Sequence, residues 1–161
     1  MKLLIFIFLF TNFIFAKSDF ISTYTASFSQ IITNPNGQNI TYNGDLYIKK
    51  PNKMLWKYTQ PIKKYVYMNN KNIIIDEPEL EQAIFTQITD EINIIKLLNN
   101  PENIDKKYNL TFKNNLLVKI TYQDELENIV NINFTNIKQN ININDKLFIF
   151  NAPQDYDIIR K

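Results

Sequence analysis

The 161-residue sequence contains no cysteine and no histidine, and each absence removes a class of chemistry. Without cysteine the chain has no disulfide, no thiol nucleophile and no residue to carry a lipoprotein-type lipid anchor of its own. Without histidine it lacks the commonest general base and the usual zinc ligand, which excludes Ser-His triads and ordinary zinc sites. The two glycines, Gly37 and Gly44, are too few for a P-loop or a dinucleotide-binding turn. We therefore expect no catalytic residue, no metal and no cofactor.

An excess of one charge is also missing, since 18 basic and 16 acidic side chains give a net charge of +2. Nucleic acid is therefore not an expected partner, because phosphate binding favours a strongly basic surface. Acidic side chains are densest between Asp76 and Glu81, which we interpret as a solvated turn around Pro78. Neither a raised pKa nor a positioned partner is indicated there by the sequence. A carboxylate enzyme built on this run is the remotest alternative.

A long hydrophobic run is present only at the amino terminus. Lys2 precedes a wholly apolar stretch from Leu3 to Phe10, and Phe13 to Ala16 extends it. A basic start, an apolar core and a small final residue are typical of a secretory signal peptide, and the stretch is short for a span of about 20 residues. We expect residues 1–16 to be a signal peptide and residues 17–161 to form one exported domain. Loss of Lys2 leaves 17 basic and 16 acidic side chains, a net charge of +1.

Residues 44 to 61 alternate between apolar and polar side chains, which is the period of a strand with one buried face. The same phase continues after the break at Pro51, so two adjacent strands present large side chains to one surface. Lys50 shares this inward phase, where a lone cation would be costly without a partner. The inward-facing apolar and aromatic side chains are Leu46, Ile48, Met54, Trp56 and Tyr58.

Alternation of this kind predicts that the chain is almost entirely strand. Between residues 89 and 100 the period changes to that of an amphipathic helix, with Ile92, Ile95 and Leu98 along one face. From the residues alone, this helix either completes the core of the sheet or acts as a mobile lid. The expected strands cover residues 24–33, 39–50, 53–60, 62–69, 71–75, 81–88, 108–113, 116–122, 129–137 and 147–150.

Seven segments in this order and spacing resemble the LolA family of periplasmic lipoprotein carriers. The most informative is the Gly-x-Leu strand that runs into a basic-Pro pair and then an aromatic Trp strand. The seven segments are Phe28-Ser29-Gln30, Gly44-Asp45-Leu46 through Lys49-Lys50-Pro51-Asn52, Met54 with Trp56, Thr59-Gln60-Pro61, Asn70-Lys71, Glu81-Gln82-Ala83, and Lys146-Leu147-Phe148 through Ala152-Pro153-Gln154.

The resemblance implies a mainly β fold with short helices, a half-open antiparallel β-barrel whose concave apolar face is covered by an amphipathic helical lid. It implies a periplasmic chaperone, expected as a monomer, that takes acylated lipoproteins from an inner-membrane ABC transporter to the outer membrane. Whether an outer-membrane receptor exists stays open. Ile92, Ile95 and Leu98 would belong to the lid, and Lys50 would latch it. The acyl-chain cavity would be lined by Phe28, Leu46, Ile48, Met54, Trp56 and Tyr58.

Two features depart from the family pattern. Only eleven residues, Lys17 to Ser27, precede Phe28, so the first helix of the lid is shortened or missing. Lys50 stands where arginine is usual, and a single ammonium group does not replace the planar five-donor fork of arginine. Two other functions stay open: an exported half-barrel that binds a different lipid or hydrophobe, and a sensor domain that binds a signalling partner.

Overall fold

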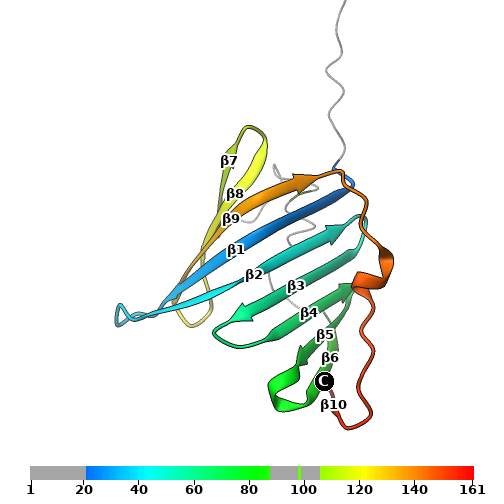
Figure 1. The fold of residues 1–161 in the computed structure, drawn as a ribbon. Coiled ribbons are helices and arrows are strands. Elements are labelled where there is room, and N and C mark those ends of the chain that lie inside the picture. Colours follow the sequence, from blue (N-terminus) through cyan, green and yellow to red (C-terminus); the bar gives the residue numbers. More distant parts are fainter. Residues whose placement is uncertain (1–20, 88–97, 99–105) are drawn as a thin grey trace, which may run out of the picture.

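The computed structural model describes residues 21–87, 98 and 106–161. Within these ranges ten strands form one sheet (Figure 1), and nine of them lie close to the predicted ranges. The signal peptide expected at residues 1–16, and Ile92 and Ile95 of the expected lid, lie outside the described residues. The strands are β1 (Thr23–Thr33), β2 (Asn39–Lys49), β3 (Lys53–Gln60), β4 (Lys64–Asn69), β5 (Asn72–Glu77), β6 (Gln82–Gln87), β7 (Tyr108–Lys113), β8 (Leu116–Gln123), β9 (Ile129–Gln139) and β10 (Asp157–Arg160).

The sheet is open, with β10 at one edge and β7 at the other, in the order β10-β6-β5-β4-β3-β2-β1-β9-β8-β7. Neighbouring strands are antiparallel except for β10, which pairs with β6 in parallel. Since β7 and β10 do not pair with one another, the sheet does not close into a full barrel. This confirms the predicted half-open antiparallel architecture. No helix within the described ranges has the length and apolar character needed to cross a bilayer.

The pleat gives the sheet two different faces. Even-numbered residues of β1 to β4 point to the face that we call inner, as the alternation predicts. Tyr24, Leu46, Ile48 and Ile120 are fully buried on this face, and the Tyr24 hydroxyl donates to the Leu117 carbonyl at 2.8 Å. The main hydrophobic core of the described residues therefore lies on the inner face.

Asparagine occupies several turns that need a positive φ. Asn70 adopts φ 57° in the β4–β5 connection, as its place between two predicted strands indicates. Asn114 and Asn115 have φ values of 50° and 61° and connect β7 to β8. With only two glycines available, the chain uses the residue that tolerates the left-handed region best after glycine.

The region after β9 differs from the prediction. Residues 147–150 were expected to form a strand, but Asp145–Phe148 form the 3-10 helix η3, which the Asn144 side chain caps by accepting from the Lys146 amide at 3.0 Å. The run Leu147 to Phe150 is apolar enough for a strand, yet the capping residue just before it favours a helical turn. Strand β10 was not predicted.

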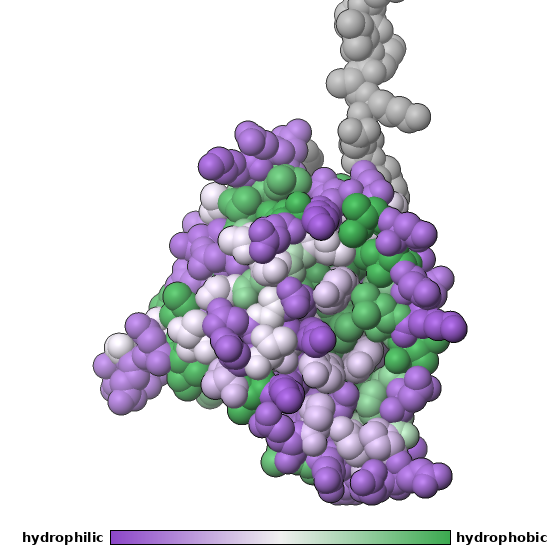
Figure 2. Space-filling model, viewed as in Figure 1, coloured by the Kyte–Doolittle hydropathy of each residue, from purple (hydrophilic) through white to green (hydrophobic). Residues whose placement is uncertain are grey.

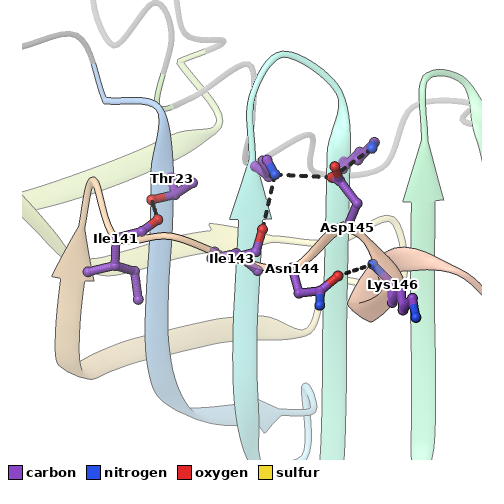
Figure 3. A network of polar contacts seen from close by, with 8 residues as sticks. Thr23, Ile141, Ile143, Asn144, Asp145 and Lys146 are labelled. Atoms are coloured by element: carbon purple, nitrogen blue, oxygen red, sulfur yellow. Dashed lines mark hydrogen bonds and ion pairs between the residues drawn. The ribbon is translucent and has the colours of Figure 1, made fainter.

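Residues 140–150, which we call the strap, cross the outer face of the sheet (Figure 3). Thr23 Oγ1 donates to the carbonyl of Ile141 at 2.8 Å, and Lys49 Nζ donates to the carbonyl of Ile143 at 3.0 Å. Lys49 and Lys53 also pair with Asp145 at 3.1 and 2.9 Å. The strap is therefore held against the strands β1, β2 and β3 that it crosses.

A second hydrophobic cluster lies beneath the strap. Leu55 from β3 packs with Ile143 and Phe148, and all three are buried. Leu55 has the outward phase of its strand, so alternation alone gives no reason to expect it in a core. The strap explains its burial.

The acidic run at Asp76 to Glu81 is only partly the solvated turn that we expected. Pro78–Leu80 form the short 3-10 helix η1, with Glu79 and Glu81 exposed. Asp76, in contrast, is buried on the outer face, and this burial raises the pKa of its carboxyl group, while a hydrogen bond from Tyr156 partly opposes the rise. The expectation of a fully solvated run without a partner was wrong for Asp76, because Tyr156 arrives from a distant part of the chain.

Candidate apolar binding cavity

The inner face encloses a cavity of about 690 Å³. Its wall on one side comes from β3, β4 and β5, and on the other side from β7, β8 and the β8–β9 turn. The apolar and aromatic lining residues are Met54, Trp56, Tyr58, Val66, Met68, Ile73, Ile75, Tyr108, Tyr122, Leu126 and Ile132. The polar and charged lining residues are Gln30, Lys64, Thr86, Gln87, Lys107, Gln123, Asp124 and Glu125. The apolar part of the lining suits a hydrophobic ligand.

The six residues predicted for the cavity separate into two groups. Met54, Trp56 and Tyr58 line it directly. Leu46 and Ile48 have no exposed surface and lie beneath the lining as part of the packed core. The remaining member, Phe28, is also buried and supports the lining from behind, as the next paragraph describes.

Aromatic rings build a rigid section of the wall. Trp56 and Tyr58 are stacked, with ring centroids 6.1 Å apart and an angle of 11° between the planes. Phe28 meets both edge-on, at 5.2 Å from Trp56 and 5.1 Å from Tyr58. Tyr58 donates to Gln30 Oε1 at 3.0 Å, and the Lys64 ammonium group lies 4.8 Å from its ring centroid. Tyr58 thus marks the change from apolar wall to polar rim.

Methionines make another part of the lining adaptable. Met54 and Met68 are paired across β3 and β4, and both line the cavity. Their unbranched side chains can repack around ligands of different shape. The cavity therefore combines fixed aromatic rings with flexible thioethers.

The opposite wall was missed by the sequence analysis. Tyr108 of β7 and Tyr122 of β8 pair across their strands with ring centroids 5.4 Å apart, and both line the cavity. Alternation indicates which side chains share a face of one strand. It does not say how far the sheet curls, and that curl brings these tyrosines opposite β3 and β4.

The β8–β9 turn forms part of the cavity rim and is held by one side chain. Asp124 Oδ1 accepts from the amides of Leu126 and Asn128 at 2.9 Å each, and Oδ2 accepts from Asn128 Nδ2 at 2.9 Å. Slight desolvation raises the pKa of Asp124, but these hydrogen bonds outweigh it and hold the pKa below its ordinary value. The turn is rigid, and it presents Leu126 with 77% of its surface exposed.

The expected latch and lid are represented by two described residues. Lys50 lies in the β2–β3 connection, its amide donates to the Ser22 carbonyl at 2.9 Å, and burial lowers the pKa of its ammonium group. Leu98 is helical, 8% exposed, and belongs to the inner-face core. The apolar stripe predicted for residues 89–100 therefore contacts the inner face at least through Leu98.

A second depression, of about 390 Å³, lies on the outer face over β9, β1, β2 and β3. Hydroxyl, amide and carboxylate side chains line most of it, including Ser27, Asn43 and Asp45. Figure 2 shows neutral and hydrophilic side chains over the middle strands of this face. This depression does not offer the apolar lining of the inner cavity.

The open sheet and its largely apolar inner cavity define a half-open β-barrel whose inner face suits hydrophobic ligands. No group of three or more His, Cys, Asp or Glu side chains in the described ranges could hold a metal ion. The family model described as "Outer membrane lipoprotein carrier protein LolA" matches residues 19–115. The chain belongs to the LolA family.

Individual relatives agree with this assignment, and a solved structure has a similar fold. The chain is 34% identical to an outer-membrane lipoprotein carrier protein of Campylobacter jejuni, with 99% of each chain covered. It is 35% identical to one of Helicobacter pylori strain HPAG1, with 88% of this chain and 82% of the relative covered. The fold resembles that of a LolA superfamily protein from Nitrosomonas europaea with a TM-score of 0.54, at 10% identity and with 80% and 90% of the two chains covered.

Proposed function

We propose that the protein carries acylated lipoproteins through the periplasm to the outer membrane, with their acyl chains sheltered in the inner cavity. The observation that carries this proposal is the cavity of about 690 Å³, lined by aromatic rings and methionines, in a chain of the lipoprotein carrier family. Transfer of apolar chains through water costs about 0.8 kcal/mol for each CH₂ group, which is on the order of 10 kcal/mol for one long chain. Such a cost makes an apolar shelter necessary.

The test is a charge placed in the cavity wall. Met54 lines the cavity and is 6% exposed, so Met54→Glu should weaken binding of a fluorescent diacylated lipopeptide at least tenfold, because an ionised carboxylate opposes an apolar ligand. Met54→Leu conserves volume and should bind normally. Ile48→Glu is a poor probe, since Ile48 is fully buried and the charge would unfold the sheet. Unchanged lipopeptide affinity in a folded Met54→Glu variant, verified by thermal unfolding, contradicts the proposal.

Export and handover complete the proposed function. We expect the signal peptide to be removed after Ala16, so that the mature periplasmic protein begins at Lys17. Cargo would be received from an inner-membrane ABC transporter, a role that rests on family membership. Amino-terminal sequencing of the periplasmic fraction tests the export step, and a retained Met1 would contradict it.

We also propose that Lys50 latches the segment 89–100 through hydrogen bonds to backbone carbonyls. Lys50 directly follows β2, at a position that the sequence alternation assigns to the inner face, and burial lowers the pKa of its ammonium group, which indicates a partly desolvated cation. A hydrogen bond from a charged donor contributes about 1.5–3 kcal/mol, which suits a reversible latch.

The latch has its own test, separate from cavity binding. Lys50→Leu should accelerate hydrogen exchange across residues 89–100 and change the rate of lipopeptide release. Lys50→Arg keeps the positive charge, so both hydrogen exchange and the rate of lipopeptide release should be as in the wild type. If exchange and release are normal in Lys50→Leu, Lys50 has no latch function.

A further inference from the structure

Trp56 contributes a buried hydrogen-bond donor without a partner to the wall of the inner cavity. Its side chain is 7% exposed, and its indole Nε1 has no hydrogen-bond acceptor among the described residues. Two other side-chain atoms of the described chain, Asp76 Oδ1 and Gln139 Nε2, are buried without a partner, but neither residue lines the cavity. Burial removes the water that would accept from such a donor, so an unpaired donor is costly. In the wall of a binding cavity, it indicates an acceptor that a ligand brings.

Fixed and adaptable side chains surround the Trp56 ring. Phe28 meets it edge-on and Tyr58 stacks on it, so the direction of the N–H bond is constrained. Met54 lies two positions earlier on the same face of β3, with Met68 opposite it on β4, and both line the cavity. Because methionine side chains adapt readily, a ligand can rearrange this part of the lining and reach the indole edge.

Gln30 of β1 supplies a second donor to the lining. It lines the cavity and is 8% exposed. Its Oε1 accepts from the Tyr58 hydroxyl group at 3.0 Å, so the Nε2 end of the amide offers its N–H groups to another acceptor. Tyr58 connects the two donors, since it stacks on Trp56 and is hydrogen-bonded to Gln30.

The chemistry of this pair defines the ligand group that fits it. Trp56 and Gln30 present donors, while the one acceptor of the pair, Gln30 Oε1, is already used. A ligand hydroxyl or amide would bring a donor of its own, and an ionised group would have to leave water for a largely apolar wall. An ester carbonyl oxygen accepts, carries no charge and is joined directly to a hydrocarbon chain. It therefore matches both the donors and the lining around them.

We propose that Trp56 Nε1 and Gln30 Nε2 bind the ester carbonyl oxygens of a diacyl ligand and make the cavity selective for ester-linked chains. This inference rests on the proposed function and adds the chemical group that the cavity recognises. The apolar wall shelters the chains, and the two donors determine the specificity. A ligand without the carbonyl oxygens leaves the buried donors unpaired, so the cavity binds it more weakly.

Two fluorescent lipopeptides that differ only in the linkage of their chains test this selectivity. One carries two palmitoyl chains in ester linkage, and the other carries two hexadecyl chains in ether linkage, so that CH₂ replaces each carbonyl group. Hydrophobicity alone would favour the diether. We expect the wild type to bind the diester about tenfold more tightly, a difference of about 1.4 kcal/mol.

Substitutions assign the selectivity to the two donors. Trp56→Phe keeps an aromatic ring but removes the N–H group, and it should reduce the preference for the diester to about twofold or less. Gln30→Met is similar in shape and should also reduce the preference. Met68→Leu is the matched control in the same lining, because it conserves volume and keeps both donors. Its ratio of the two affinities should equal that of the wild type, even where both affinities change.

A spectroscopic signal tests the Trp56 contact without any substitution. Trp56 is the one tryptophan of the sequence, so its indole N–H group gives a single signal in a proton–nitrogen correlation spectrum. Loading with the diester should move the indole proton downfield, because a hydrogen bond to a carbonyl oxygen deshields it. The diether should not produce this shift.

The outcomes separate this inference from the proposed function. Equal affinity of the wild type for the two lipopeptides overturns the inference alone. So does a diester preference that persists in Trp56→Phe, or an indole shift that is the same with both ligands. Failure of the wild type to bind either lipopeptide overturns the proposed function, and this inference with it.

Discussion

Gly44 lies at a close approach of β2 to β3. A Cβ atom at this position would lie 1.9 Å from the Lys57 carbonyl oxygen and 2.9 Å from Cε1 of Phe28. The β2–β3 register shifts between Asn43 and Gly44, and Phe28 is the β1 partner of Gly44. Absence of a side chain therefore lets the Phe28 ring lie over the strand and support the aromatic wall of the cavity.

We expect Gly44→Ala to lower the free energy of unfolding by about 2 kcal/mol or more, because backbone rather than a flexible side chain must move. Gly37→Asn is the control. Gly37 has φ 80° with nothing within 4 Å of the position that a Cβ atom would take, and asparagine tolerates this region, so its cost should stay below about 1 kcal/mol. Urea unfolding of both variants gives the comparison, and equal losses would show that the close approach at Gly44 is not limiting.

Asp76 should make stability depend on pH. Its pKa is raised from 3.8 by burial, so the neutral carboxyl group is favoured in the folded state. The free energy of unfolding should fall as pH rises from 3.8 through the raised folded pKa, because the unfolded state then ionises more readily. Asp76→Asn should therefore be more stable than the wild type at pH 7, with the difference shrinking in acid below pH 3.8. Unfolding curves of both proteins at pH 7 and below pH 3.8 test this prediction. An Asp76→Asn variant that is less stable than the wild type at pH 7 contradicts it.

At the scale of elements, the strap is held by two kinds of contact with different strength. Phe148 is 6% exposed in the cluster with Leu55 and Ile143, whereas the side chain of Asp145 is 57% exposed. Exposed ion pairs contribute little, since water and salt screen them. The apolar contacts should therefore dominate.

Phe148→Ala should cost about 3 kcal/mol of unfolding free energy, the usual range for a buried aromatic side chain. Asp145→Asn should cost much less, and the cost should decrease further in high salt. Limited proteolysis between residues 140 and 150 supplies a local readout, with rapid cleavage expected in Phe148→Ala alone. If Asp145→Asn is cleaved as quickly, the ion pairs hold the strap.

A strand could be predicted wherever its own residues alternate between apolar and polar side chains. The alternation around Leu46 and Trp56 needs nothing beyond its neighbours in sequence, so β2 and β3 were located to within a residue. Strand β10 is short, with Ile158 and Ile159 as its apolar residues, and its stability comes from parallel pairing with β6. Burial of Leu55 and the position of Tyr122 likewise depend on distant parts of the chain. Local patterns do not contain that information.

For the whole molecule, β10 protects one edge of the sheet. It covers β6, where Ala83 has no exposed surface, and Arg160 lies 5.6 Å from the centroid of the Phe85 ring. Removal of residues 156–161 should uncover β6 as an unprotected edge, which favours pairing between molecules. Sedimentation should show concentration-dependent association of the truncated protein. Arg160→Ala keeps the strand and should sediment like the wild type. A truncated protein that does not associate would show that β10 is not needed to protect this edge.

The position of β1 has a consequence for the time course of folding. This central strand pairs with β2, which follows it closely, and with β9, which lies far along the chain. Ser22 and Asn140, whose hydrogen bond closes this junction, are separated by 118 positions. Pairing of such distant segments requires a large loop to close first, and proteins dominated by such pairings fold in milliseconds to seconds. Until β9 reaches β1, one edge of β1 lacks its neighbour, so the folding chain passes through a stage in which it needs protection from aggregation itself.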